Sequence, residues 1–431
     1  MYTLTIGVPF RRRDEQRCEV ASDWAKSLLL LRDSLGGRFG KITVAAPALP
    51  MEDGLIGQQT PAILHAGRDE IQFEQLGVKG WRARQFWRSY PSIRAACDRL
   101  ARSSQVIHCG INDLWQPYAI MGFNAAQRAN VTSVFVLDGD AVQRMADLGS
   151  GAGMMRKLKD AVYGKLYVRV AKKAVAKADL SLLKGRALHE RYGRFARNAR
   201  DFFDTSFHAT DIIGARQLEE KCRSIGAGEA IRCLSLGRLV DYKGVDHTIQ
   251  AVAEAGKRGA NVMLDVIGEG PAEDELKQLA KSRGLAERVR FLGKRPYGPE
   301  LLREIAAYHL MLFTSMAEET PRSLFDAMAG GCGLLAFDLS FTRQVVGQCG
   351  HGAVVGRGDV NGLAEMLLSL DHQRPKLIEW IKTAASRAAE HTAEVWYRRR
   401  AEWTFEAYER HEHGAGAVAM PMSVAAAHES A

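Results

Sequence analysis

The sequence lacks the long apolar segments of a membrane-spanning or exported protein. No hydrophobic run approaches the roughly 20 residues that a helix needs to cross a bilayer. The apolar N-terminus, Met1–Phe10, is followed by Arg11, Arg12 and Arg13. A signal peptide carries its positive charge before its apolar stretch, so this order is the wrong one. We therefore expect a cytoplasmic protein, either soluble or peripheral on the inner face of the membrane.

Cysteine and histidine are both sparse and lie in no recognisable pattern. The seven cysteines include no C-x-x-C pair, and their number is odd, which argues against a disulfide framework or a structural zinc site. Buried free thiols are the simpler interpretation. His108, His189 and His208 are isolated from other metal ligands. The sequence also has no Gly-x-Ser-x-Gly elbow, so neither a metal centre nor a serine hydrolase is expected.

Acidic residues are too few to balance the basic ones, and the net charge is +9. Such an excess fits nucleic acid, an anionic membrane or a phosphate-rich ligand. The sequence contains no zinc finger, aromatic RNA-binding signature or basic zipper. Nucleic acid is therefore not expected, and the basic residues instead gather in particular segments.

The first half of the chain alternates short apolar runs with longer periodic ones. Strands are predicted over Leu4–Pro9, Lys41–Ala46, Gln105–Cys109 and Ser133–Leu137, and helices over Cys18–Leu35 and Trp115–Arg128. This rhythm predicts a parallel sheet with helices on both faces.

The second half repeats the rhythm and predicts a second doubly wound domain. Strands are predicted over Ala230–Leu236, Val262–Ile267, Val289–Leu292, Met311–Phe313 and Leu334–Phe337, and helices over Val245–Lys257, Glu273–Ser282, Glu300–Ala307 and Arg322–Ala329. A polar stretch, Thr210–Glu229, marks the boundary, so we expect domains over 1–212 and 213–393. An aromatic, basic helix follows over 394–413, and an Ala-, Gly- and Ser-rich tail over 414–431 is expected to be disordered.

A basic loop between the first strand and first helix of the second domain is the first candidate site. It reads Ser235-Leu-Gly-Arg-Leu-Val-Asp-Tyr-Lys-Gly244 and presents Arg238 and Lys243 before the helix begins. Two cations beside a helix N-terminus suit a diphosphate, because the free amides and the dipole also favour anions. Taken alone, the loop fits two merely solvated side chains equally well.

An acidic pair around a later helix start is the second candidate. Thr320 is the predicted cap of this helix, with Pro321 and Arg322 in its first turn. Glu318 lies in the loop before it, and Asp326 about one turn inside. Carboxylates accept hydrogen bonds from sugar hydroxyls, and the amides between them could hold phosphates. Considered alone, the acids are more simply favourable charges at a helix N-terminus.

Together the two segments lie at the carboxyl ends of strands of one predicted domain, where open α/β sheets bind ligands. The stretch Leu234–Leu370, which contains both segments, resembles the retaining GT-B glycosyltransferases of family GT4. That family grips the donor diphosphate with a Gly-Arg…Lys-Gly segment, here Gly237-Arg238 and Lys243-Gly244. Its Glu-x7-Glu motif, here Glu318 to Asp326, precedes Ala-Met-Ala-x-Gly. The resemblance implies a GT-B fold: two Rossmann-like domains facing a cleft, with the C-terminal helix crossing back to the first domain.

The resemblance also implies roles for individual residues. Arg238 and Lys243 stabilise the leaving nucleoside diphosphate, Glu318 contacts the donor sugar and Asp326 contacts the ribose. Further donor-binding residues are expected at Gly237, Gly268, Gly270, Gly293, Thr320, Pro321, Arg322, Ser323 and Leu324. The expected donor is a UDP- or GDP-sugar, and no metal or other cofactor is expected.

Three features depart from the family pattern. Asp326 is one methylene shorter than the usual glutamate, so its ribose contact is expected to be altered or water-mediated. The loop after the first strand reads Pro9-Phe-Arg-Arg-Arg instead of Gly-Gly, and its arginines are candidate phosphate partners. Asp138 stands where the family tends to have histidine. It is either a catalytic, sugar-contacting residue or, equally well, the cap of a helix over Ala141–Leu148.

The segment Met154–Ala178 is strongly basic, with Asp160 as its one acid. Apolar residues recur in it at helical spacing, namely Met155, Leu158, Val162, Leu166 and Val170. Such a helix can lie on an anionic membrane surface, which would suit a lipid-linked acceptor. Alternatively, it is an ordinary domain helix with a solvated cationic face.

The resemblance implies a retaining hexosyltransferase of the EC 2.4.1 type. It would move a hexose from a nucleotide diphosphate sugar to a glycan or lipid-linked acceptor, in envelope or exopolysaccharide synthesis. The donor would lie mainly on the second domain and the acceptor on the first. Two alternatives keep the fold: a catalytically degenerate scaffold or partner subunit, and a sugar-nucleotide epimerase.

Overall fold

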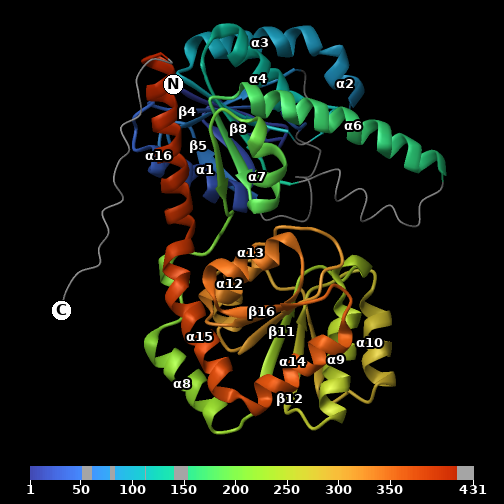
Figure 1. Cartoon of the computed structure of the whole chain (residues 1–431). Helices are drawn as coiled ribbons and strands as arrows, with labels where there is room; N and C mark the ends of the chain where they lie inside the picture. The colour runs from blue at the N-terminus through green and yellow to red at the C-terminus, as the bar shows by residue number, and fades with distance from the viewer. Residues whose placement is uncertain (51–60, 78–82, 112, 140–153, 415–431) are drawn as a thin grey trace.

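The computed structural model describes residues 1–50, 61–77, 83–111, 113–139 and 154–414. It contains two parallel sheets, each covered on both faces by helices, one above the other in Figure 1. Strand order is β10-β9-β8-β7-β1-β4-β6 in the first sheet and β13-β12-β11-β14-β15-β16 in the second. The prediction of two doubly wound α/β domains is confirmed.

The first sheet is built from strands β1 (Tyr2–Thr5), β4 (Ile42–Ala46), β6 (Ile71–Gln75), β7 (Val106–Gly110), β8 (Thr132–Leu137), β9 (Leu180–Lys184) and β10 (Ala199–Phe202). Its helices are α1 (Ser22–Leu35), α2 (Ala83–Arg88), α3 (Tyr90–Ser103), α4 (Tyr118–Ala129), α6 (Met154–Lys177) and α7 (Arg186–Tyr192). The five inner strands are mostly buried, as expected of a parallel sheet that is covered on both faces, whereas the edge strands β6 and β10 are partly exposed.

The second sheet is built from strands β11 (Ile231–Leu236), β12 (Val262–Ile267), β13 (Val289–Gly293), β14 (Leu310–Phe313), β15 (Gly333–Phe337) and β16 (Gly352–Val355). Its helices are α8 (Ala215–Gly226), α9 (Val245–Lys257), α10 (Glu273–Ser282), α11 (Pro299–Ile305), α12 (Ser323–Ala329), α13 (Ser340–Cys349), α14 (Val360–His372) and α15 (Arg374–Ala388). Helix α9, strand β12 and helix α10 have the predicted bounds, because each is a clear periodic run between polar or glycine-containing loops.

The predicted helix over Cys18–Leu35 is wrong in its first turn. Residues Arg17–Ala21 form strand β3, which pairs antiparallel with β2 (Arg11–Arg12) and β5 (Pro61–His65). Helix α1 begins only at Ser22. The reason lies in the strand's partners, because β5 supplies backbone hydrogen bonds from a segment distant in the sequence.

The same small sheet engages the arginines after the first strand, and their phosphate contact stays a prediction. Arg11 Nη1 lies 2.7 Å from Glu19 Oε1, and Arg13 Nε donates to Glu19 Oε2 at 2.5 Å. Glu19 is buried, so it requires these cations as partners. Arg12 donates to the Phe73 carbonyl at 2.6 Å. The three guanidinium groups are therefore engaged within the first domain.

The last helix, α16 (Ala393–Glu412), crosses from the second domain back to the first (Figure 1). The ring of Phe39 lies 5.7 Å from that of Phe405 and 5.2 Å from that of Tyr408. This aromatic contact fixes the helix beside the first sheet, as predicted.

The chain passes between the two sheets in the segment from Phe202, which ends β10, to Ala215, which begins α8. The predicted domain boundary lies in this segment. Residues 415–431, for which the sequence predicts disorder, lie outside the described residues. Within the described part of the chain, no helix has the length and apolarity required to cross a membrane.

Candidate active site

A cavity of about 260 Å³ lies between the two domains, at the carboxyl ends of their strands. The first domain contributes Gly139, Lys184, Gly185, Ala187, Leu188 and Arg191. The second domain contributes Glu318, Glu319, Thr320, Ser340, Phe341 and Arg357. Small-molecule sites typically have volumes of about 300 to 1,000 Å³. This cavity is therefore the size for one sugar rather than for a whole nucleotide sugar.

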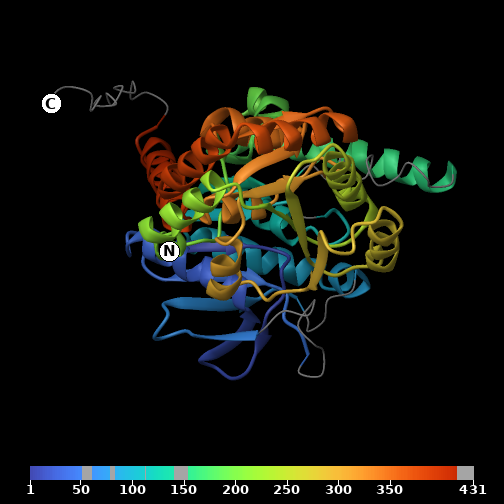
Figure 2. The ribbon, with the colours of Figure 1, turned by 90° about the horizontal axis from the view of Figure 1, so that it is seen from below.

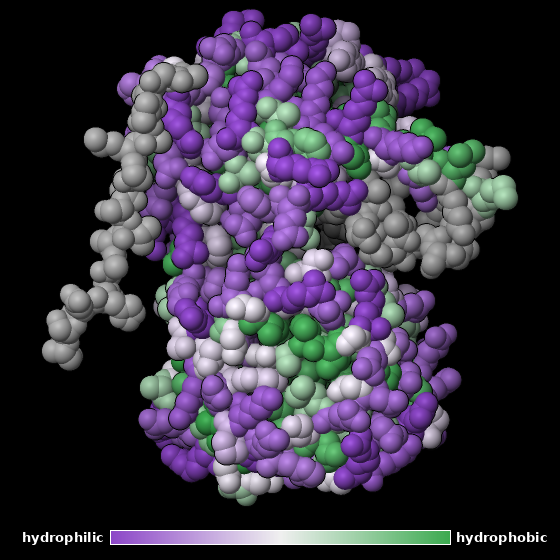
Figure 3. Space-filling model, viewed as in Figure 1, coloured by the Kyte–Doolittle hydropathy of each residue, from purple (hydrophilic) through white to green (hydrophobic). Residues whose placement is uncertain are grey.

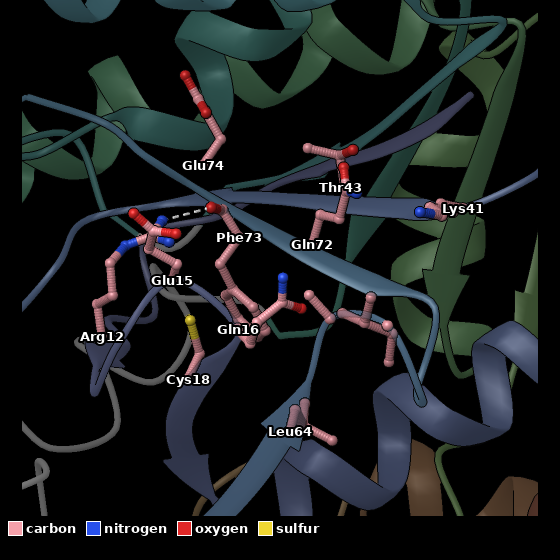
Figure 4. A pocket seen from close by; sticks show the side chains of 13 residues that line it. Arg12, Glu15, Gln16, Cys18, Lys41, Thr43, Leu64, Gln72, Phe73 and Glu74 are labelled. Carbon is pink, nitrogen blue, oxygen red and sulfur yellow. Dashed lines mark hydrogen bonds between the residues drawn. The ribbon is translucent and has the colours of Figure 1, made fainter.

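A larger cavity of about 400 Å³ lies elsewhere, at the edge of the first sheet (Figure 4). Its wall includes Arg12, Gln16, Lys41 and Phe73, and the Arg12 guanidinium donates to the Phe73 carbonyl. None of the residues predicted to bind the donor lines it. The interdomain cavity is therefore the candidate active site.

Glu318 reaches the interdomain cavity from the loop after β14. Its Oε1 accepts hydrogen bonds from Ser340 N at 3.0 Å and from Ser340 Oγ at 3.2 Å. Ser340 begins α13, so the carboxylate lies at a helix N-terminus, where its negative charge is stabilised. Arg357 Nη2 lies 4.0 Å from the same oxygen. These contacts fix the carboxylate at the cavity wall, where its predicted sugar contact would be made.

Lys243 lies next to this wall, at the end of a short 3-10 helix and directly before α9. Its Nζ is 2.5 Å from Glu319 Oε2, and both side chains are largely buried. Gly244 follows with φ of +63°, and a Cβ there would lie 2.1 Å from the Thr314 carbonyl oxygen. Only glycine fits such a position. This close approach between the start of α9 and the end of β14 brings Lys243 and Glu319 together.

Glu319 is a candidate site residue that the sequence reasoning passed over. It lines the cavity, and its Oε1 is buried without a hydrogen-bond partner among the described residues. A buried carboxylate oxygen without a partner is costly. The Lys243–Glu319 pair therefore leaves polar groups at the cavity that a ligand can satisfy. The position of Glu319 next to Glu318 in the sequence is the signal that could have identified it.

The glycines predicted to lie near the nucleotide hold two loops against each other. A Cβ at Gly268 would lie 1.8 Å from the Gly237 carbonyl oxygen, and one at Gly270 would lie 2.1 Å from that of Leu239. Gly293 has φ of +69°, and its carbonyl accepts from Gly268 N at 3.0 Å. These contacts set the path of the loop that carries Arg238. They give the glycines a backbone-packing role, and their donor contact stays a prediction.

The predicted cap at Thr320 is wrong. Helix α12 begins at Ser323 and has no side-chain cap; its first backbone bonds run from Phe325 N and Asp326 N to the Arg322 carbonyl, at 2.9 and 3.1 Å. Thr320 instead lines the cavity. Arg322, directly before the helix, already has helical backbone angles of φ −66° and ψ −29°.

The predicted donor-binding residues between Glu318 and Asp326 lie in different places: at the cavity, at the domain interface and in the core. Arg322 Nη1 donates to Ser206 Oγ at 2.6 Å, and its Nη2 lies 4.0 Å from Asp23 on α1, so it bridges to the first domain. Leu324 is buried in the core. A donor contact by Leu324 would therefore have to come from its backbone. Pro321 and Ser323 are partly exposed beside them.

Asp326 lies inside the protein, with 4% of its surface exposed, and lines none of the cavities described above. Tyr297 donates its hydroxyl to Asp326 Oδ1 at 3.2 Å, and the Arg322 guanidinium lies over the Tyr297 ring. Burial raises the pKa of the Asp326 carboxyl to about 7. Its predicted ribose contact would require this carboxyl to become accessible when a donor binds.

The raised pKa predicts a pH-dependent effect of Asp326→Asn. The folded state holds a proton on this carboxyl up to about pH 7, whereas the unfolded chain loses it near its ordinary value. The contribution of this carboxyl to the free energy of unfolding therefore falls as the pH rises from the ordinary carboxyl pKa to about 7, and it stays low at higher pH. One pKa unit is about 1.4 kcal/mol, so the isosteric amide should stabilise the protein at pH 8 by on the order of 4 kcal/mol.

Calorimetric melting at pH 8 and at pH 5 tests this expectation. The Asp326→Asn midpoint should exceed that of the wild type at pH 8, and the gap should narrow at pH 5. Glu287→Gln, an exposed change in the turn before β13, serves as the control and should give the wild-type midpoint at both pH values. A lower midpoint for Asp326→Asn at pH 8 would show that the ionised carboxylate stabilises the fold.

Arg238 and Asp138 lie outside the wall of the interdomain cavity. Arg238 is exposed in the loop after β11. Asp138, at the end of β8, is exposed at a separate cavity of about 260 Å³ in the first domain, while the adjacent Gly139 lines the interdomain cavity. The alternative role of Asp138, as the cap of a helix over Ala141–Leu148, concerns residues outside the described part of the chain.

The first domain supplies cations that sequence reasoning missed. Lys184 ends β9, and Arg191 lies on α7, which follows Gly185. Lys184 Nζ lies 3.5 Å from Asp204 Oδ2. A short apolar run that ends at a glycine, Leu180-Ser-Leu-Leu-Lys, could have identified these cations. It repeats the strand–loop–helix pattern of the second domain. These residues face Glu318 across the cavity because Arg186 N donates to Gln344 Oε1, at 2.6 Å, and joins α7 to α13.

No group of three or more metal-ligating side chains occurs among the described residues.

The second domain is similar to a known protein family. Residues 219–387 match the family model described as glycosyl transferases group 1. The 2-deoxystreptamine glucosyltransferase of Streptomyces kanamyceticus is 30% identical over 145 residues, which cover 33% of this chain and 37% of that protein. The chain thus matches little more than a third of the length of this relative.

Solved structures resemble the chain over nearly its whole length. The crystal structure of Anabaena HepE in complex with UDP has a TM-score of 0.62 and 18% identity, and the match covers 94% of this chain and 100% of HepE. WaaG, a glycosyltransferase involved in lipopolysaccharide biosynthesis, has a TM-score of 0.59 and 14% identity, with 93% and 99% covered. At these identities the likeness shows the fold. The chain therefore has the GT-B fold, and within it the second domain, over residues 219–387, is similar to the glycosyl transferases group 1.

Proposed function

We propose that this chain is a retaining hexosyltransferase that uses a nucleotide diphosphate sugar. Its acceptor would be a glycan or lipid-linked sugar in envelope or exopolysaccharide synthesis. The observation that carries the proposal is the interdomain cavity, which is sized for one sugar and has Glu318 fixed in its wall. Its relatives' names agree with such a role, since HepE was crystallised with UDP and WaaG is involved in lipopolysaccharide biosynthesis.

The leaving diphosphate is proposed to lie beside Lys243 and Arg238. Lys243 stands directly before α9, where the first amides of the helix and its dipole add to the positive charge. Positioned charges of this kind stabilise negative charge that develops on a leaving group. In this proposal Lys243 exchanges its contact with Glu319 for the diphosphate, and no metal ion takes part.

The acceptor is proposed to enter from the first domain. The cavity beside Asp138 is lined by Tyr2, His108 and Trp24, among others. Asp138 in its wall is followed directly by Gly139 in the wall of the interdomain cavity, and this junction links the two walls. An acceptor hydroxyl at this junction would lie next to the sugar held by Glu318. Asp138 is the proposed sugar- or acceptor-contacting residue of the first domain.

Thermal-shift measurements with UDP-, GDP- and ADP-sugars test the proposal at its first step. A ligand at about 100 times its Kd stabilises the folded state by about 2.7 kcal/mol. We expect one class of sugar nucleotide to raise the melting midpoint of the wild type by several degrees, and the other classes to raise it less. If no sugar nucleotide shifts the midpoint, the chain is not a donor-binding enzyme.

Product analysis with the binding donor separates the remaining possibilities. A glycosyltransferase releases the nucleoside diphosphate and, with acceptor present, transfers the sugar with its anomeric configuration retained. A degenerate scaffold would bind the donor without releasing diphosphate. An epimerase would change the sugar without needing an acceptor. Inversion at the anomeric carbon would contradict the retaining mechanism alone.

A further inference from the structure

Helix α6 extends away from the body of the first domain. Figures 1 and 2, which are related by a 90° rotation, both show one end of it projecting past the neighbouring helices. The other end is anchored by one face, on which Tyr167, Ala171 and Val175 are at most 1% exposed. Their spacing of four residues places them on one stripe of the helix. This buried stripe holds α6 to the domain, and Val170 packs against the same cluster.

The opposite face of α6 carries a second apolar row. Met154, Leu158, Val162 and Leu166 follow at four-residue spacing and are 88%, 61%, 62% and 51% exposed. Figure 3 shows this apolar colour at the projecting end of α6. None of the four packs into any hydrophobic cluster of the described residues. We call these four residues the α6 ridge. An exposed apolar row of this kind marks an interaction surface.

Cations continue the same face toward the other end of the helix. Lys165, Arg169 and Lys173 repeat at four-residue spacing and are exposed. At 100° per residue they point in nearly the same direction as Leu158 and Val162. The face is thus apolar at its projecting end and cationic where it joins the domain.

An exposed tryptophan lies beside this face. Trp115 is 67% exposed, and its ring stacks on Tyr163 of α6 with centroids 6.1 Å apart and planes 15° apart. The Tyr163 hydroxyl accepts a hydrogen bond from Leu114 N at 3.1 Å, which fixes the two rings to each other. Tryptophan and tyrosine are enriched where a protein meets the boundary between lipid and water.

We propose that α6 and Trp115 form a docking surface for an anionic phospholipid membrane. The α6 ridge enters the boundary between headgroups and acyl chains, and Lys165, Arg169 and Lys173 contact the lipid phosphates. Charge complementarity selects this occupant, because a purely apolar partner would leave the cations unpaired. The inference goes beyond the proposed function, since docking requires neither a donor nor an acceptor.

Vesicle flotation with the full-length protein tests the cationic part of the surface. Vesicles of phosphatidylcholine alone are compared with vesicles that also contain phosphatidylglycerol. Each basic residue near an anionic surface strengthens binding by about fivefold, so Lys165→Glu/Arg169→Glu should weaken binding to the anionic vesicles by at least about 25-fold. The matched control Lys281→Glu/Arg283→Glu changes the net charge equally on α10 and the loop that follows, and should bind like the wild type.

A second variant and a fluorescence measurement test the apolar part. Leu158→Asn/Val162→Asn should lose binding to anionic vesicles while its cations are intact. Brominated lipids should quench the emission of Trp115, identified by its absence in Trp115→Phe. Melting midpoints equal to that of the wild type show that the variants fold. If one of the two α6 variants does not fold, the proposal is tested by the other variant and by the quenching of Trp115.

Three results would overturn the proposal. The first is wild-type protein that does not float with anionic vesicles. The second is wild-type binding by both α6 variants, or an equal loss in the α10 control. The third is a wild-type dimer that Leu158→Asn/Val162→Asn converts to a monomer without any vesicle binding, which would make the ridge an interface between two copies. None of these results depends on glycosyltransferase activity.

Discussion

Replacing Lys243 with alanine is expected to lower kcat for donor turnover by about 10²- to 10³-fold, the typical cost of removing one group that stabilises transition-state charge. The reason is its position: it lies directly before α9, is largely buried and is 2.5 Å from Glu319 at the cavity wall. Low exposure strengthens its interaction with a diphosphate. Steady-state release of the nucleoside diphosphate from the donor measures the effect.

Two variants separate catalysis from structure in this experiment. Glu319→Gln removes the charge that holds Lys243 in the unliganded protein, and should retain activity within about tenfold because Lys243 remains. Lys257→Ala removes an exposed lysine from the other end of α9 and should have no effect. If Glu319→Gln loses as much activity as Lys243→Ala, the ion pair itself is what the enzyme needs. If Lys243→Ala retains full activity, Lys243 does not contact the leaving group.

Glu318→Gln is expected to cause the second large loss, about 10²-fold in kcat with little change in donor affinity. The amide oxygen can still accept from Ser340 N and Ser340 Oγ, so the side chain keeps its place and only its charge is lost. A carboxylate in the sugar cavity acts on the transition state by stabilising positive charge on the sugar. Comparing kcat with the donor Kd from calorimetry measures the two effects separately.

Ser340→Ala is the matched control for Glu318. It removes the contact of Oγ with the carboxylate but keeps the contact of the Ser340 N–H, so a smaller loss, about tenfold, is expected from poorer positioning. The order of activity should be wild type, then Ser340→Ala, then Glu318→Gln. An equal donor Kd in the wild type and both variants would show that the substitutions affect catalysis and not donor binding. A Glu318→Gln variant with wild-type kcat and weaker donor binding would limit Glu318 to substrate binding.

Much of the second domain could be predicted because its signals are local. Helix α9 and strand β12 are periodic runs bounded by polar or glycine-containing loops, and their predicted bounds are those of the structure. The placement of Lys243 before a helix also follows from the sequence alone. Its contact with Glu319 does not, since it depends on the close approach of Gly244 to the Thr314 carbonyl across two elements distant in sequence.

Other features of the structure also depend on distant partners. Cys18 and its neighbours form a strand because β5, far along the chain, pairs with them. Asp326 has the motif position of a ribose contact, which stays a prediction, and its burial against Tyr297 does not follow from the motif. On α6, the apolar stripe that the sequence shows most clearly is exposed, and a second stripe with Tyr167 is buried. Sequence periodicity locates apolar faces but does not say which of two faces the domain covers.

The central claim is that the interdomain cavity holds the donor sugar, with the diphosphate on Lys243. A crystal structure of the protein with its sugar nucleotide, selected by thermal shift, tests it most directly. The account predicts the sugar in the cavity against Glu318, and Lys243 Nζ within about 3 Å of a diphosphate oxygen and released from Glu319. A nucleotide bound in another cavity, with Lys243 still paired to Glu319, would contradict it.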